Sequence, residues 1–115
     1  MSLKIFHNPR CSKSRSTLEI LSDNNTDVDV VEYLKTPPDK EELKSILDML
    51  GMGPRDLMRK HEAPYKENNL ENNSLSDDEL IDYMIKYPIL IERPIVVSNG
   101  RAVIGRPPEK VKELF

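Results

Sequence analysis

The chain has 115 residues and a formal net charge of −3, with 37% of its residues hydrophobic and 32% charged. This length predicts one domain, which buries roughly two thirds of its unfolded surface and folds without a disulfide or structural metal. The acidic balance argues against a protein that binds nucleic acid through bulk charge. The single cysteine excludes an internal disulfide and a cysteine-rich zinc site, so we expect one free thiol and no metal.

No segment approaches the ~20 apolar residues that a membrane-spanning helix needs. The first residues lead directly into a strand-like run at residues 3–6 and lack the apolar region of a secretory signal. We therefore expect a cytoplasmic monomer without a nucleic-acid or membrane partner.

The first forty residues predict a β-α-β arrangement. Residues 3–6 and 27–33 have strand patterns, and residues 12–22 place apolar side chains at helical spacing. The polar cluster at residues 23–26 predicts the turn that ends this helix. A right-handed crossover makes the two strands parallel.

The middle of the chain predicts helices. Thr36 or Asp39 is the expected N-cap of a helix that Gly51 ends. The polar segment at residues 54–73 is predicted to be helical as well. Ser76 begins a further helix with the spacing of a capping box.

The last part of the chain predicts a hairpin followed by a helix. Residues 94–97 and 102–104 are apolar and flank Asn99-Gly100, which suits a type I′ turn. Pro107-Pro108 opens a final helix that runs through Phe115.

These elements predict an α/β fold. A β-α-β half followed by a β-β-α half is the layout of the thioredoxin fold. We expect a single thioredoxin-like domain over residues 1–115, with a helical insertion at about residues 39–87.

Cys11 lies where the loop after the first strand enters the first helix. A helix N-terminus carries roughly half a positive charge and free N–H donors, which stabilise a thiolate. Side chains that can assist ionisation surround it: His7, Arg10, Ser12, Lys13, Ser14 and Arg15. Many free cysteines are buried and inert, but this setting favours a thiol with a pKa below ~8.5 and nucleophilic reactivity.

The same loop predicts an anion site. Backbone N–H groups at a helix start, with hydroxyl and guanidinium groups around them, bind anions readily. Because the nucleophile and the anion site coincide, the expected substrate is an oxyanion that a thiolate attacks.

Five segments, spread over the chain in order, resemble the ArsC family of glutaredoxin-coupled arsenate reductases. They are His7-Asn8-Pro9-x-Cys11-x-x-Ser14-Arg15, residues 32–38, Leu57-Met58-Arg59-Lys60, residues 88–97 and Gly105-Arg106-Pro107-Pro108. The resemblance also implies a thioredoxin-like fold.

The resemblance implies a reaction. Cys11 would attack arsenate, glutathione would displace the adduct, and glutaredoxin would resolve the resulting mixed disulfide and release arsenite. Glutathione is then a co-substrate, and no bound cofactor is expected. Since Cys11 is the only cysteine, the reducing equivalents have to come from outside thiols.

The resemblance also implies roles for other residues. Arg59, Arg93 and Arg106 match the arginines that hold the oxyanion and lower the thiol pKa, because planar guanidinium groups pair bidentately with such anions. Pro94 matches the cis-proline of thioredoxin-like folds. Three residues of the active-site loop are expected to tune the thiol: His7, Ser14 and Arg15.

Some residues depart from the family pattern and leave other functions open. Arg10, Ser12 and Lys13 stand where the family tends to have smaller residues, so the added charge either tightens anion binding or suits another substrate. One alternative is an Spx-like regulator that binds RNA polymerase, although Ser14 in place of a second cysteine rules out its disulfide switch. The other is a monothiol glutathione-dependent oxidoreductase.

Overall fold

A computed structural model describes residues 2–24 and 27–114. The chain divides into two units, of which the first combines Met1–Thr36 with Arg93–Phe115 and the second is Pro37–Glu92. The helical insertion predicted at about residues 39–87 therefore falls within the second unit.

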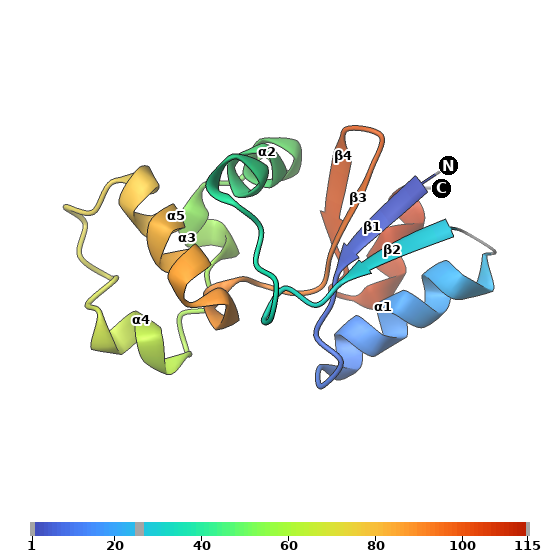
Figure 1. Ribbon diagram of the computed structural model, residues 1–115, viewed down its shortest axis with the longest axis horizontal. Helices are drawn as coiled ribbons and strands as arrows, with labels where there is room; N and C mark the ends of the chain where they lie inside the picture. The colour runs from blue at the N-terminus through green and yellow to red at the C-terminus, as the bar shows by residue number, and fades with distance from the viewer. Residues whose placement is uncertain (1, 25–26, 115) are drawn as a thin grey trace. The chain divides into compact units, whose positions relative to one another are not determined.

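The first unit is built on a four-stranded sheet in the order β2-β1-β3-β4 (Figure 1). The strands are β1 (Ser2–Phe6), β2 (Asp27–Val31), β3 (Ile95–Ser98) and β4 (Arg101–Ile104). β1 pairs with β2 in parallel and with β3 in antiparallel orientation, and β3 and β4 are antiparallel. This is the predicted α/β layout of a thioredoxin-like fold.

Helix α1 (Ser12–Asp23) and the 3-10 helix η2 (Pro108–Leu114) pack together with the sheet. Strand alternation points Leu3 and Ile5 to the same side. The buried core of this layer comprises Leu3, Ile5, Leu21, Val96, Val111 and Leu114. Two predicted details, the end of the turn at Asn25-Thr26 and the end of the last helix at Phe115, lie outside the described residues.

The hairpin between β3 and β4 has the predicted turn. Asn99 and Gly100 have φ values of 49° and 77°, and Ser98 pairs with Arg101 across the turn. Positive φ at both central residues is the type I′ geometry, which Asn-Gly adopts at low cost.

β2 ends earlier than predicted. The prediction extended the strand to Tyr33, but the carbonyl of Glu32 accepts hydrogen bonds from Lys35 N (3.0 Å) and Thr36 N (2.9 Å) and closes a turn instead. Tyr33 is buried in this turn at 1% exposure.

The second unit contains two longer helices with the predicted ends. Helix α2 (Lys40–Leu50) starts at Asp39, whose carboxylate accepts from Glu42 N at 2.8 Å, and it stops at Gly51, with φ 67°. Helix α5 (Asp77–Lys86) begins with the capping box between Ser76 and Glu79.

The helical prediction for residues 54–73 is only partly confirmed. Two short helices, α3 (Pro54–Leu57) and α4 (Ala63–Glu67), occupy part of it, and Met58 between them is extended. Met58 forms an antiparallel bridge with Ile91, just after the 3-10 helix η1 (Pro88–Leu90). Backbone hydrogen bonds between the residues around Met58 and the segment around Ile91, which is distant in sequence, take the place of hydrogen bonds within a helix.

Within residues 2–24 and 27–114, no helix has both the length and the apolar character of a bilayer crossing.

Candidate active site

Cys11 is the N-cap residue of α1. Its backbone is extended, its N–H donates to Asn8 O at 3.0 Å, and its carbonyl accepts from Arg15 N at 3.0 Å. The thiol is partly buried. The first-turn N–H groups of a helix have no intrahelical acceptor, so the sulfur sits where such donors are available.

The surroundings lower the pKa of the Cys11 thiol below its ordinary value. Burial acts the other way and raises the pKa, but the backbone N–H groups of Ser14 and Lys13 and the Arg93 guanidinium together outweigh it. The side chain of Lys13 is itself exposed. The thiolate is thus stabilised by the helix start and by an arginine distant in sequence.

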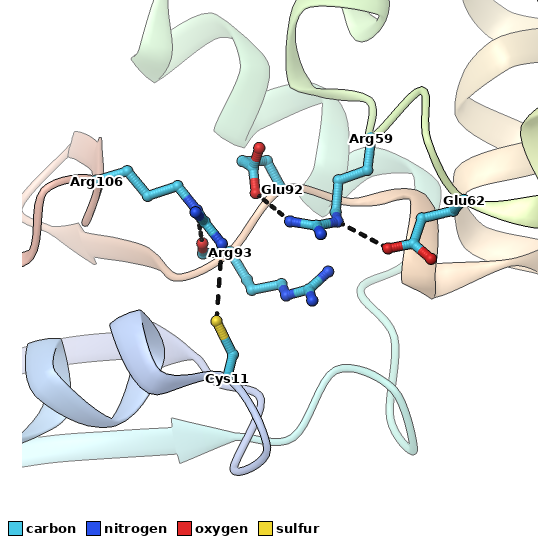
Figure 2. A network of polar contacts seen from close by, with 6 residues as sticks. All are labelled: Cys11, Arg59, Glu62, Glu92, Arg93 and Arg106. Atoms are coloured by element: carbon cyan, nitrogen blue, oxygen red, sulfur yellow. Dashed lines mark hydrogen bonds and ion pairs between the residues drawn. The ribbon is translucent and has the colours of Figure 1, made fainter.

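Arg93 and Arg106 both contact the thiol region. Arg106 Nη2 donates to Cys11 Sγ at 3.7 Å, and Arg106 Nε donates to the Arg93 carbonyl at 2.8 Å (Figure 2). The Arg93–Pro94 peptide bond is cis, the geometry that the resemblance implies, and Arg106–Pro107 is cis as well. The structure therefore brings together Cys11 and two of the three predicted arginines.

The missing side chain of Gly105 allows the next residue, Arg106, to approach Cys11. A Cβ at this glycine would lie 2.5 Å from Thr17 Oγ1 and 2.9 Å from Pro94 Cγ. Gly105 N also donates to Pro94 O at 2.9 Å. No residue pattern predicted this role, although a glycine at the end of a strand pattern can mark a close backbone approach.

His7 and Ser14 form a buried hydrogen-bond network. Ser14 Oγ lies 2.7 Å from His7 Nδ1 and accepts from Asn8 N at 3.0 Å. The hydroxyl of Ser14 is thus engaged within the loop, and the backbone N–H of this residue serves the sulfur. The tuning of the thiol by Ser14 stays a prediction.

Burial lowers the pKa of His7 below its ordinary value, aided by Arg15 and opposed by the Glu32 carboxylate. His7 is therefore mainly neutral at pH 7, and it supplies no lasting positive charge to the thiolate. Arg15 Nη1 donates to Pro9 O at 3.0 Å and braces the same loop. The tuning of the thiol by His7 and Arg15 stays a prediction.

Arg59 belongs to the second unit, where two carboxylates hold it. Arg59 Nε contacts Glu62 Oε2 at 3.0 Å, and Nη1 contacts Glu92 Oε1 at 2.8 Å (Figure 2). Partial burial lowers the pKa of Arg59, but the two carboxylates outweigh it and raise the pKa above its ordinary value. Sequence reasoning missed both glutamates. The role of Arg59 as an oxyanion ligand stays a prediction.

Replacing Ser14 with alanine is expected to lower the free energy of unfolding by about 1–2 kcal/mol, because His7 Nδ1 and Asn8 N–H lose a buried partner. Urea denaturation measures this. The matched control is Ser12→Ala, since Ser12 is exposed on the same turn and surface changes stay within about 0.5 kcal/mol. Equal effects of the two substitutions would contradict the network.

In the part of the chain that the structure describes, no cluster of three or more His, Cys, Asp or Glu side chains is placed to hold a metal ion.

The fold and the site together define a thioredoxin-like protein with a single cysteine of lowered pKa. The ArsC family model matches residues 6–114, and the chain belongs to the ArsC family.

The chain is similar to named proteins over nearly its whole length. It is 55% identical over 113 residues to "Uncharacterized protein YfgD" of Escherichia coli strain K12, covering 97% of this chain and 95% of that protein. It is 48% identical over 114 residues to "Arsenate reductase" of Neisseria meningitidis serogroup B, covering 98% and 97%. The solved structure "Arsenate reductase from Vibrio cholerae" matches with a TM-score of 0.96 and 51% identity, covering 100% of this chain and 98% of that one.

Proposed function

We propose that this protein is an arsenate reductase with Cys11 as the nucleophile. Membership of the ArsC family and the relatives named arsenate reductase support this. The observation that carries the proposal is the thiol of lowered pKa with Arg106 Nη2 at 3.7 Å and Arg93 stabilising the thiolate. A nucleophile beside two guanidinium groups suits an anionic electrophile with several oxygens.

In the first step, the Cys11 thiolate attacks arsenic. An Sγ–As bond forms, and one oxygen leaves as hydroxide, which takes up a proton to give water. Arg93 and Arg106 orient the oxyanion and balance its charge during attack. The proposal includes Arg59 as a third ligand, as the family resemblance implies.

In the second step, a glutathione thiolate attacks Cys11 Sγ. A disulfide forms between the two sulfurs, and the electron pair of the S–As bond stays on arsenic, which is reduced from As(V) to As(III) and leaves as arsenite. A glutaredoxin thiol then takes the glutathionyl group and restores the Cys11 thiolate. The single cysteine makes an external thiol necessary at this point.

The test is a coupled assay. NADPH oxidation is followed with glutathione, glutathione reductase and glutaredoxin, with and without arsenate, for the wild type and Cys11→Ser. We expect arsenate-dependent turnover that Cys11→Ser abolishes, together with one glutathione on Cys11 by mass spectrometry.

Two results would count against the proposal. Turnover with thioredoxin alone would contradict the glutathione coupling. No arsenate-dependent turnover, from a protein whose Cys11 alkylates rapidly at neutral pH, would contradict arsenate as substrate. The monothiol oxidoreductase then becomes the better interpretation, with reduction of a protein mixed disulfide as its assay, and an Spx-like role requires binding to RNA polymerase.

A further inference from the structure

The first unit has a pocket of about 220 Å³ beside the active-site loop. Two segments line it, the loop after β1 and the turn after β2, which begin at neighbouring carboxyl ends of two parallel strands. Ligands of open α/β sheets bind outside such strand ends. Arg10 lines this pocket and directly precedes Cys11 in the chain, so the pocket lies beside the loop that leads to the nucleophile, although Cys11 itself does not line it.

The pocket presents charges of both signs. Arg10 and Lys35 are cationic, Glu32 is anionic, and Leu34 adds an apolar side chain that is 40% exposed. Lys35 Nζ lies 3.6 Å from Glu32 Oε1, with 79% and 45% of the two side chains exposed. Such exposed pairs contribute about 0–1 kcal/mol, so each partner can turn to a ligand at little cost.

Arg10 makes no side-chain ion pair that involves the described residues. Its backbone N–H donates to Asn8 Oδ1 at 3.0 Å, and Asn8 is buried. The backbone of Arg10 is therefore fixed while its guanidinium is exposed. An arginine with a fixed backbone and an exposed planar guanidinium group is suited to binding a carboxylate.

We propose that this pocket binds glutathione, with Glu32 and Lys35 holding the γ-glutamyl end and Arg10 holding the glycine carboxylate. Glutathione carries an ammonium and a carboxylate on one carbon of its γ-glutamyl end, which match the neighbouring Glu32 and Lys35. Its second carboxylate matches Arg10, and its thiol lies between the two ends. The pocket is smaller than the ~300–1,000 Å³ of drug-sized sites. It therefore holds the two charged ends of the tripeptide, and the thiol between them projects out of the pocket.

This inference rests on the proposed function, because it assigns a site to the reductant of that reaction. It also gives a role to Arg10, which stands where the family tends to have a smaller residue. The charge there serves the thiol co-substrate and leaves oxyanion binding to Arg59, Arg93 and Arg106.

The test is the double variant Arg10→Ala/Lys35→Ala in the coupled assay. We expect the KM for glutathione to rise about tenfold, the effect of losing one hydrogen bond to a charged group, with the KM for arsenate and the rate of Cys11 alkylation by iodoacetamide unchanged. The matched control is Lys112→Ala, which removes an exposed cation on η2 and is expected to leave the KM for glutathione unchanged. An unchanged KM for glutathione in the double variant, or an equal rise in the KM for arsenate, would overturn the proposal.

A second measurement works without arsenate. The Cys11 thiolate attacks a sulfur of glutathione disulfide, so that a Cys11–glutathione disulfide forms and one glutathione thiolate leaves. We expect the double variant to slow this reaction about tenfold but to leave the reaction with uncharged hydroxyethyl disulfide unchanged. Equal rates with glutathione disulfide in wild type and variant would reject the pocket, whereas slower rates without arsenate turnover would reject the proposed function alone.

Discussion

Arg93→Ala is expected to lower kcat/KM for arsenate by roughly 10²–10³-fold, the usual cost of removing one donor that stabilises an oxyanion. Arg93 also stabilises the Cys11 thiolate, so its loss raises the pKa of Cys11. The rate of iodoacetamide alkylation against pH reports this change directly. We expect the midpoint of that profile to move to higher pH in the variant, since burial continues to favour the neutral thiol.

The control for this prediction is Arg101→Ala. Arg101 is exposed at the start of β4, and its Nη2 donates to Glu113 O at 2.8 Å. Its removal deletes the same charge from the same unit and is expected to leave both the alkylation profile and kcat/KM unchanged. A fall in kcat/KM for Arg93→Ala with no shift of the alkylation profile would separate oxyanion binding from thiolate stabilisation and contradict the second role.

The lowered pKa of Cys11 also links stability to pH. Because the pKa in the folded state lies below that of the unfolded chain, the thiolate stabilises the fold fully above the unfolded pKa of ~8.5. This contribution is lost as the pH falls through the folded pKa. In Arg93→Ala the two pKa values lie closer together, so the same pH window carries a smaller change in the free energy of unfolding.

Gly105→Ala is expected to lower the free energy of unfolding by about 3 kcal/mol, at the upper end of typical overpacking costs. The added Cβ meets Thr17 Oγ1 at 2.5 Å and Pro94 Cγ at 2.9 Å, so α1 or the Pro94 segment has to move. Each kcal/mol corresponds to ~4–8 °C in Tm for a domain of this size. Arg106 follows Gly105 directly, and we expect arsenate turnover to fall as well.

A double-mutant cycle with Thr17→Ala tests the cause. Removing Thr17 Oγ1 and Cγ2 deletes the nearest contact but leaves Pro94, so Gly105→Ala/Thr17→Ala is expected to recover part of the lost stability. Gly53→Ala is the control, because a Cβ there lies 3.7 Å from Asp56 Oδ2, an ordinary contact. Additive effects of the two substitutions would show that Thr17 is not what the new methyl group meets.

The elements that the sequence predicted correctly depend on neighbours in the chain. Asp39 and Ser76 cap helices with N–H groups three residues away, and Asn99-Gly100 determines its own turn. Met58 shows the opposite case, since its extended backbone depends on Ile91. No pattern within residues 54–73 contains that information, which explains why a helix was predicted there.

The same distinction applies to the site. Cys11 could be identified from the local setting of a helix start, and its arginines from the family resemblance. The hydrogen bonds of Ser14 Oγ with His7 and Asn8 could not be predicted from the sequence, because they depend on how the loop folds back on α1. Burial likewise decides the protonation of His7, and local sequence does not reveal burial of a polar loop residue.

The first unit is assembled from both ends of the chain, and this has a consequence for folding kinetics. β1 pairs with β2 soon after it in the sequence, but its other edge pairs with β3, which arrives only after Pro37–Glu92. Contacts between such distant segments slow folding, because loop closure costs entropy before the pairing compensates for it. When the second unit folds early, Pro37–Glu92 no longer behaves as a long flexible loop, because its own structure fixes the distance between its two ends. The rate at which Arg93 and Arg106 reach Cys11 in a newly made chain therefore depends in part on the second unit, whose residues belong to neither β1 nor β3.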